Sequence, residues 1–176
     1  MPDYPTLADL GDDAPPAPSE TVTAAVPDGS RQLLDWLTAE GFRVRLDEDG
    51  DLHLRHEGRD VYVVLDPGDP VYVRFVAPDL YVCDDEAEAH LALVVANDLT
   101  GALKTVKVFL ARKRAVLFSI ELFLDGFEAF RAVALRCLEL LGTAAWEFRA
   151  RMREARQQVA EETAEGAGEG RDAEGA

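Results

Sequence analysis

The sequence predicts an α+β fold: an antiparallel sheet of about six strands, in two groups, packed with helices and followed by a long C-terminal helix. Stretches that alternate apolar and polar residues, as strands do, occur in two groups. Amphipathic helical stretches precede, separate and follow these groups, which gives the order α-β-β-β-β-α-β-β-α. With 48% hydrophobic residues, a chain of 176 residues can bury one substantial core.

Both ends of the chain differ from its middle in composition. Residues 1–28 contain six acidic residues, no Lys or Arg, and a proline-rich run from Pro15 to Pro18. Residues 158–176 contain six acidic residues, one Arg and many Gly and Ala. Such segments bury too little apolar surface to fold, so we expect a disordered acidic lead and a disordered acidic tail. Residues 29–157 then form the domain.

The first predicted helix covers residues 31–40. Ser30 can cap it, because a serine side chain accepts hydrogen bonds from the first free N–H groups of a helix. Gly41 can end it, because glycine adopts the left-handed conformation found at helix ends. Its apolar side is expected to contain Leu33, Leu34, Trp36 and Leu37.

The strand register in residues 41–65 follows from the turns. A two-residue loop at Asp49 and Gly50 would divide the apolar residues between the two faces of the sheet. A three-residue loop of Glu48, Asp49 and Gly50 keeps them on one face and places the glycine in a left-handed conformation. The pairs expected from it are Leu46 with Leu52, Val44 with Leu54, and Phe42 with His56.

Two further turns extend this sheet. A two-residue loop at Gly58 and Arg59 would set Leu54 opposite Val63 and Leu52 opposite Leu65. The dense turn signal in residues 66–70 leads to a fourth strand over residues 71–76, which Pro78 is expected to end. The pairs expected there are Val71 with Leu65, Val73 with Val63, and Phe75 with Val61.

The second half repeats the order of a helix and a hairpin. Asp84, Asp85 and Glu86 suit the positive end of a helix that runs to about Leu99, with Gly101 closing it. Its buried stripe is expected to be Leu91, Val94, Val95 and Leu99. A hairpin follows, over the turn formed by Arg112, Lys113 and Arg114. The expected pairs are Leu110 with Val116, Val108 with Phe118, and Val106 with Ile120.

The last helix is predicted from Gly126 to about Gln157, with Asp125 as its cap. One face is expected to contain Phe127, Phe130, Ala134, Cys137, Leu138, Leu141, Ala145 and Phe148. The Arg-rich end of this helix suits its negative dipole end and the acidic tail after it. These residues are Arg149, Arg151, Arg153 and Arg156.

Charge and composition exclude several classes of function. A net charge of −16 disfavours binding to nucleic acids and to anionic membranes, since phosphate contacts need clustered Lys and Arg. Cys83 and Cys137 are flanked by apolar residues, which favours buried thiols over a disulfide framework. No apolar stretch reaches transmembrane length and no secretory signal is recognisable, so we expect a cytoplasmic protein.

The possible chemical sites are weak when their ligands are counted. The D-x-D-G pattern at Asp47 begins like a calcium loop, but position twelve is Gly58 and not the required glutamate. His53 and His56 would point to opposite faces of a strand, and His90 has one nearby carboxylate, so neither makes a zinc site. No nucleophile or phosphate-loop motif is present. We therefore predict no catalytic, cofactor-binding or metal-binding residue. The turn of Arg112, Lys113 and Arg114 could hold a phosphate or an acidic peptide, although a solvated turn is favoured.

Two segments resemble a known family. RQLLDWLTAEGFRVRLDEDGDLHL (residues 31–54) and HLALVVANDLTGALKTVKVFLARKRAVLFSIELFL (residues 90–124), with the closing helix, resemble the YbjN-like domain family and its relatives, the type III secretion chaperones. The resemblance covers about residues 30–150. It implies a non-enzymatic peptide-binding or regulatory module, often dimeric. The basic turn at residues 112–114 departs from the acidic, glycine-containing turn typical of that family.

These observations lead to one functional expectation and one alternative. We expect a chaperone-like, homodimeric module that binds an extended segment of a partner protein. The candidate contact residues are Trp36, His53, Arg55, Tyr62, Val64, Tyr72 and Trp146. The alternative is a regulatory module in bacterial signalling or secretion that contacts its partner through the acidic tails.

Overall fold

The computed structural model describes residues 28–47, 49–111 and 114–172. The elements follow one another as α1 (Asp28–Ala39), β1 (Val44–Leu46), β2 (Leu52–His56), β3 (Arg59–Asp66), β4 (Asp69–Val82), α2 (Glu86–Ala102), β5 (Val106–Leu110), β6 (Ala115–Phe123) and α3 (Gly126–Asp172). The predicted fold class and the predicted order of elements are confirmed.

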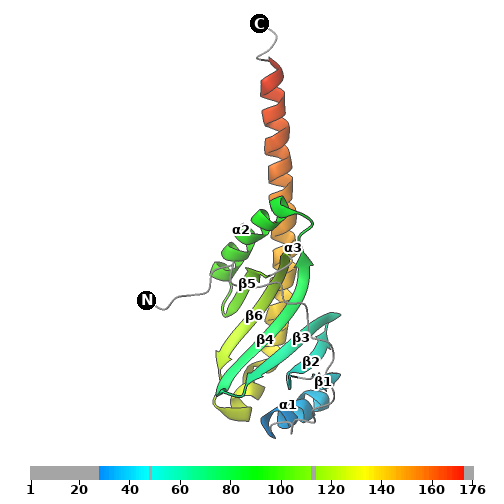
Figure 1. The fold of residues 1–176 in the computed structure, drawn as a ribbon, viewed down its shortest axis with the longest axis vertical. Coiled ribbons are helices and arrows are strands. Elements are labelled where there is room, and N and C mark those ends of the chain that lie inside the picture. The colour runs from blue at the N-terminus through cyan, green and yellow to red at the C-terminus, as the bar shows by residue number, and fades with distance from the viewer. Residues whose placement is uncertain (1–27, 48, 112–113, 173–176) are drawn as a thin grey trace, which may run out of the picture.

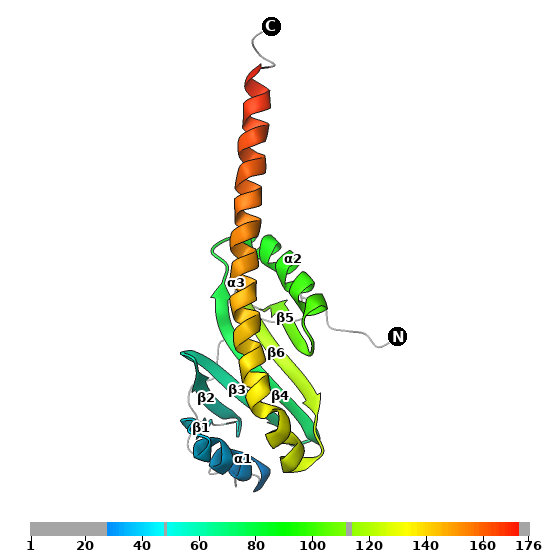
Figure 2. The ribbon, with the colours of Figure 1, turned by 180° about the vertical axis from the view of Figure 1, so that it is seen from behind.

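The strands form one antiparallel sheet of six strands in the order β1-β2-β3-β4-β6-β5. Helix α3 runs along one face of this sheet: the sheet lies in front of it in Figure 1 and behind it in Figure 2. Helix α1 packs near β1 at one end, and α2 lies beside β5 at the other. Among the described residues, no helix covers the opposite face of the sheet (Figure 1).

The core lies between this sheet and α3. Aromatic pairs join the two layers: Phe75 stacks on Phe130 with ring centroids 5.6 Å apart, and Phe118 meets Phe148 edge to face at 5.6 Å. Such pairs add to the stabilisation from apolar burial. The face predicted for α3 is confirmed, with Phe127 half-buried and the other members buried: Phe130, Ala134, Cys137, Leu138, Leu141, Ala145 and Phe148.

The first hairpin has the predicted register. Val44 lies opposite Leu54 and Leu46 opposite Leu52. Gly50 has φ 86°, the left-handed conformation that the prediction required. The turn is held by the carboxylate of Asp47, which accepts the N–H of residue 49 at 3.1 Å and of residue 51 at 2.9 Å. Glu48, part of the predicted loop, lies outside the described residues.

The second turn was predicted one residue too late. It consists of Glu57 and Gly58, both with positive φ, at 49° and 78°. A two-residue turn with positive φ at both positions matches the twist of the strands that it joins. Leu54 therefore lies opposite Val61, and Leu52 opposite Val63. The register is shifted by two residues from the prediction, which leaves the buried face unchanged.

The fourth strand also differs from its prediction. Val63 lies opposite Phe75 and Leu65 opposite Val73, with a register shift after Leu65. Strand β4 does not end at Pro78 but continues to Val82. A second register shift, between residues 77 and 81, accommodates the proline. Proline has no N–H to donate to a neighbouring strand, and in this irregular stretch the regular pairing is interrupted.

Helix α1 begins before its predicted cap and ends where predicted. It starts at Asp28, so Ser30 lies inside the first turn, with only 2% of its surface exposed. Gly41 has φ 95° and donates its N–H to the carbonyl of Thr38 at 3.0 Å. Phe42 donates to the carbonyl of residue 37 at 3.0 Å, which completes the Schellman motif. As predicted, Leu33 and Leu37 are buried, and Leu34 and Trp36 pack against the core.

Helix α2 is capped as expected and buries part of the predicted stripe, since Val95 and Leu99 are buried and Leu91 packs against the core. Asp85 is its N-cap and accepts the N–H of Glu88 at 2.8 Å. Val94, predicted to be buried, is 59% exposed, and the helix continues through Gly101 to residue 102. The buried residues are mostly alanines, which permit a close approach to the neighbouring elements. They are Ala89, Ala92, Val95, Ala96 and Leu99.

The second hairpin has the predicted register, and the final helix is longer than predicted. The three pairs predicted between β5 and β6 are all present. Arg112 and Lys113, from the predicted turn, lie outside the described residues. Helix α3 continues past Gln157 to Asp172. The sequence that crosses the predicted end, residues 150–164, contains no Pro or Gly and is rich in strong helix formers. The boundaries of the lead and the tail stay predictions.

Candidate functional site

An apolar cavity of about 480 Å³ lies between α1, the β3–β4 turn and the start of α3. Its size falls within the range of ligand pockets. The apolar side chains that line it are Leu33, Leu65, Pro67, Pro70, Val73, Leu124, Phe127 and Phe130. Tyr72 also lines the cavity, and Asp49 and Asp66 are the acidic residues of its lining. The lining suits apolar side chains and disfavours acidic ones.

Backbone hydrogen bonds hold two walls of this cavity. At the β3–β4 turn, the carboxylate of Asp66 accepts the N–H of Gly68 at 2.7 Å. At the β6–α3 connection, Leu124 donates its N–H to the carbonyl of Val71 at 2.7 Å, and Gly126 donates to Leu124 at 3.0 Å. Gly126 has φ 83°, a conformation that side chains rarely adopt. These bonds fix the start of α3 against β4.

Aromatic contacts brace the wall formed by α1. Trp36 meets Phe130 edge to face at 5.7 Å and Phe127 at 6.3 Å, and both phenylalanines line the cavity. The guanidinium of Arg131 lies 5.9 Å from the Trp36 ring and 5.6 Å from the Phe127 ring. These distances suit cation–π contacts. Trp36 is therefore a natural reporter of changes in the cavity.

The two edges of the sheet differ in their free backbone groups. At the β5 edge, the hydroxyl of Thr100 accepts the N–H of Val108 at 2.9 Å and donates to its carbonyl at 3.1 Å. A strand added there would lose these partners. At the β1 edge, Asp47 donates its N–H to Asp51 at 2.9 Å, which marks a hydrogen-bonded pair. In antiparallel strands bonded and non-bonded pairs alternate, so the backbone groups of residues 44 and 46 point away from β2.

The ionisable groups show no reactive constellation in the described parts of the chain. Burial raises the pKa of both thiols, that of Cys137 to about 11, so neither resembles an activated nucleophile. A hydrogen bond from Lys107 lowers the pKa of Glu121, and burial raises that of Tyr72. Within the same residues, no three His, Cys, Asp or Glu side chains gather as metal ligands. None of the described helices has the length and apolar character needed to cross a membrane.

Residues 28–155 match the model of the family described as T3SS (YopN, CesT) and YbjN peptide-binding chaperone 1, TY-Chap1. The match covers most of the chain and contains every element described above, except the distal part of α3. The protein belongs to the TY-Chap1 family. The predicted resemblance to YbjN-like domains and type III secretion chaperones is confirmed.

A solved structure shares the fold of this TY-Chap1 chain. It is a crystal structure of an uncharacterized protein from Methanothermobacter thermautotrophicus, with a TM-score of 0.51 and 13% sequence identity. The similarity covers 72% of this chain and 97% of the other. No functionally curated protein matches the chain.

The candidate contact residues fall in separate places on this TY-Chap1 domain. The rings of His53 and Tyr62 stack at 4.8 Å on the open face of the sheet, and Arg55 donates to the carbonyl of Gly58 at 2.9 Å beside them. Val64 is half-buried on the same face of β3. Tyr72 lines the cavity, where Trp36 braces one wall. Trp146, 65% exposed on α3, belongs to neither surface.

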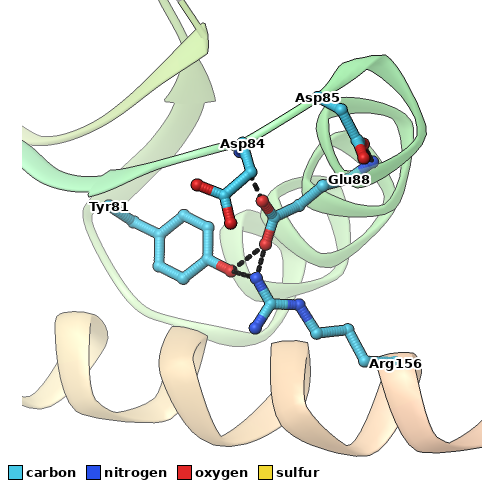
Figure 3. Close-up of polar contacts among 5 residues, drawn as sticks. All are labelled: Tyr81, Asp84, Asp85, Glu88 and Arg156. Carbon is cyan, nitrogen blue, oxygen red and sulfur yellow. Dashed lines mark hydrogen bonds and ion pairs between the residues drawn. The ribbon is translucent and has the colours of Figure 1, made fainter.

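Sequence reasoning missed a polar cluster of Tyr81, Asp84, Asp85, Glu88 and Arg156, which we call the Glu88 cluster (Figure 3). The carboxylate of Glu88, with 8% of its side chain exposed, accepts the Tyr81 hydroxyl and the Asp84 N–H, each at 2.5 Å, and pairs with Arg156. The spacing of Asp85 and Glu88 is that of a capping box, the one sequence signal for this cluster.

The Glu88 cluster changes the role of the Arg-rich end of α3. Arg156 also donates to the Tyr81 hydroxyl at 2.5 Å, and its guanidinium lies 5.8 Å from the Tyr81 ring. About two turns earlier along α3, Arg149 donates to the carbonyl of Leu80 at 2.7 Å. These two arginines were predicted to balance the helix dipole. They instead join α3 to the end of β4 and, through Glu88, to the start of α2.

Proposed function

We propose that the protein is a non-enzymatic, chaperone-like module that holds an extended segment of a partner protein. The observation that carries the proposal is the apolar cavity beside α1, which is lined mainly by apolar side chains and has the volume of a ligand site. The family description, a peptide-binding chaperone, supports the same class of ligand. Partner segments would insert apolar side chains into this cavity.

The free edge of β1 supports an extended conformation for the ligand. A segment that adds to a sheet edge gains main-chain hydrogen bonds, and its alternate side chains enter pockets. The edge of β1 leads into the β1–β2 turn, where Asp49 and Gly50 line the cavity. A segment paired with residues 44–46 would therefore reach the cavity at that turn. Its basic or neutral side chains would be preferred near Asp49 and Asp66.

Tryptophan fluorescence can test this binding. The chain has two tryptophans, so the variant Trp146→Phe leaves Trp36 as the single reporter. Titration of this full-length variant with extended apolar peptides is expected to give a saturable shift of the Trp36 emission. The peptides are chosen from an array, first screened with the unmodified protein.

Two charge insertions separate cavity binding from other effects. Leu65→Arg, in the cavity lining, is expected to weaken binding at least about tenfold, since its long charged side chain takes up space in an apolar site. Leu135→Arg, on the exposed surface of α3, is the matched control and should bind as the parent does. Equal affinities for the two variants, or no saturable peptide, would refute the proposed site.

We also propose that the protein is a homodimer. Trp146 is 65% exposed on α3, and large exposed aromatic residues are enriched in interfaces. Phe148, two residues further along α3, is fully buried and cannot contribute. Light scattering of the full chain is expected to give a dimer mass that falls to the monomer mass in Trp146→Glu. A monomer at high protein concentration would contradict the proposal.

The alternative is a regulatory module in bacterial signalling or secretion that contacts its partner through the acidic ends. Its support is the acidic composition of residues 1–28 and 158–176. Neutralising the acidic residues of both segments separates the two functions. Partner capture that persists favours the cavity, and capture that is lost favours the alternative. A cytoplasmic location belongs to both proposals.

A further inference from the structure

A hollow lined by arginines lies at the junction of β1 and β2. It has a volume of about 450 Å³ and is lined by Gly41, Phe42, Arg43, Arg45, His53 and Arg55. We call it the arginine hollow. Arg45 and His53 are opposite one another in the register, so their side chains share one face of the sheet. The arginines of the hollow therefore come from β1, from β2 and from the residue just before β1.

The charges of this hollow are only partly balanced. Arg55 lies 3.5 Å from the carboxylate of Asp60, which also contacts His53 at 2.9 Å. Arg43 and Arg45 form no ion pair with any residue that the structure describes. The chain as a whole has a net charge of −16, so this concentration of positive charge runs against its composition. An acidic ligand is the chemistry that such a site recognises.

The chain itself supplies an acidic segment that is tethered within reach of the hollow. Residues 1–27 contain five acidic residues, among them the adjacent Asp12 and Asp13, and no Lys or Arg. This segment joins α1 at Asp28, and the other end of α1 leads through Gly41 directly into the hollow. We propose that the acidic lead, residues 1–27, docks on the arginine hollow. The hollow is thus occupied by the protein's own segment until a stronger acidic ligand displaces it.

The lengths allow this docking. Helix α1 has 12 residues, and its length is therefore about 18 Å. Asp13 is 15 residues before Asp28, and a flexible chain of that length spans about 20 Å on average. The acidic pair therefore reaches the hollow without stretching the lead. A tether of this kind gives an effective concentration on the order of millimolar, so weak ion pairs suffice to keep the hollow occupied.

A spin label in the lead tests the docking on the full chain. The native Cys83 and Cys137 are 2% and 4% exposed, so a label directed at Ala14→Cys reacts at the introduced thiol. In about 0.01 M salt, where the Debye length is ~30 Å, the label is expected to reduce the amide NMR signals of β1 and β2 by at least half. The signals should recover in about 1 M NaCl, where the Debye length is ~3 Å.

Two sets of variants decide whether the arginines cause the docking. Arg43→Glu with Arg45→Glu should abolish the signal loss, whereas the matched double reversal Arg136→Glu with Arg153→Glu, on the exposed surface of α3, should leave it unchanged. If the first variant misfolds, neutralising the lead gives the same answer without altering the domain. That variant is Asp9→Asn with Asp12→Asn and Asp13→Asn, and it should also restore the signals.

Three outcomes would overturn the proposal. The first is a signal loss at β1 and β2 no greater than at α2. The second is a loss that survives both high salt and the Arg43 and Arg45 reversals, which would indicate apolar docking. The third is an undocked lead together with saturable binding of poly-glutamate to the hollow, which would assign the hollow to an acidic partner. None of these outcomes depends on whether peptides bind in the apolar cavity.

Discussion

Replacing Glu88 by alanine is expected to destabilise the fold well beyond an ordinary surface substitution. The substitution leaves the Tyr81 hydroxyl and the Asp84 N–H without their acceptor and removes the ionic partner of Arg156. The lost hydrogen bonds involve a charged acceptor that is almost fully buried, so we expect a loss of about 2–4 kcal/mol in the free energy of unfolding. For a chain of this size, that corresponds to a decrease in Tm of roughly 4–16 °C.

A double-mutant cycle apportions this loss. Arg156→Met keeps the apolar stem but removes the charge, and should cost about 1–2 kcal/mol because Glu88 keeps its other two donors. The double variant is expected to cost about 0.5–1 kcal/mol less than the sum of the single variants, since the residues are in contact. Urea unfolding monitored by circular dichroism measures each value.

Arg153→Met is the control for this cycle. Arg153 is exposed one turn before Arg156, and no ion pair is found for it among the described residues. Its variant should lie within about 0.5 kcal/mol of the parent. A Glu88→Ala variant as stable as this control would refute the structural role of the Glu88 cluster. Strict additivity of Glu88→Ala and Arg156→Met would refute the contact between them.

Three other substitutions or treatments have defined outcomes. Burial, with two nearby acidic side chains, raises the pKa of Asp51, so the ionised carboxylate is disfavoured in the fold. Asp51→Asn should therefore raise the free energy of unfolding near neutral pH. Urea titrations should show that this gain disappears below about pH 4, where the carboxyl is protonated in both the folded and the unfolded chain. Because burial raises the thiol pKa of Cys83 and Cys137, a thiol reagent near neutral pH should modify both only on unfolding, and rapid labelling of the native chain would contradict their burial. Thr100→Val removes the hydroxyl that bonds both the N–H and the carbonyl of Val108, and should cost about 1 kcal/mol in urea unfolding. Because it frees backbone groups at the sheet edge, it should also increase association in light scattering, whereas Thr100→Ser should behave as the parent.

The sequence predicted the faces of the strands better than their pairs. Side chains in a strand alternate with a period of two, so a shift of two residues keeps the same residues buried. Hydrophobic pattern cannot detect such a shift, and only the turn decides it. Gly50 fixed the first register correctly because just one loop kept the apolar residues together. At Gly58 two loops satisfied the pattern, and the backbone conformation of Glu57 decided between them.

Other differences arise from packing that a linear pattern does not contain. Helix α2 offers both a leucine and valine stripe and an alanine stripe, and the pattern favours the larger residues. The fold buries the alanines together with Val95 and Leu99, because β5 and α3 approach α2 closely, and leaves Val94 exposed. The walls of the apolar cavity come from α1, the β3–β4 turn and α3. Of the seven candidate contact residues, Tyr72 lines the cavity. Nothing in the local sequence shows that three such distant segments meet.

The two faces of β1 differ in chemistry, which leads to a prediction about ligand pattern. Val44 and Leu46 belong to the face that packs on the core, while Arg43 and Arg45 line the arginine hollow. A strand added along β1 would place alternate side chains on these two faces. Peptides in which apolar and acidic residues alternate should therefore bind more tightly than peptides of the same composition with the two kinds in separate blocks. Fluorescence titration of the Trp146→Phe variant measures both affinities. Equal affinities would show that the ligand does not pair with β1, because only a segment bound as a strand places alternate side chains on the two faces.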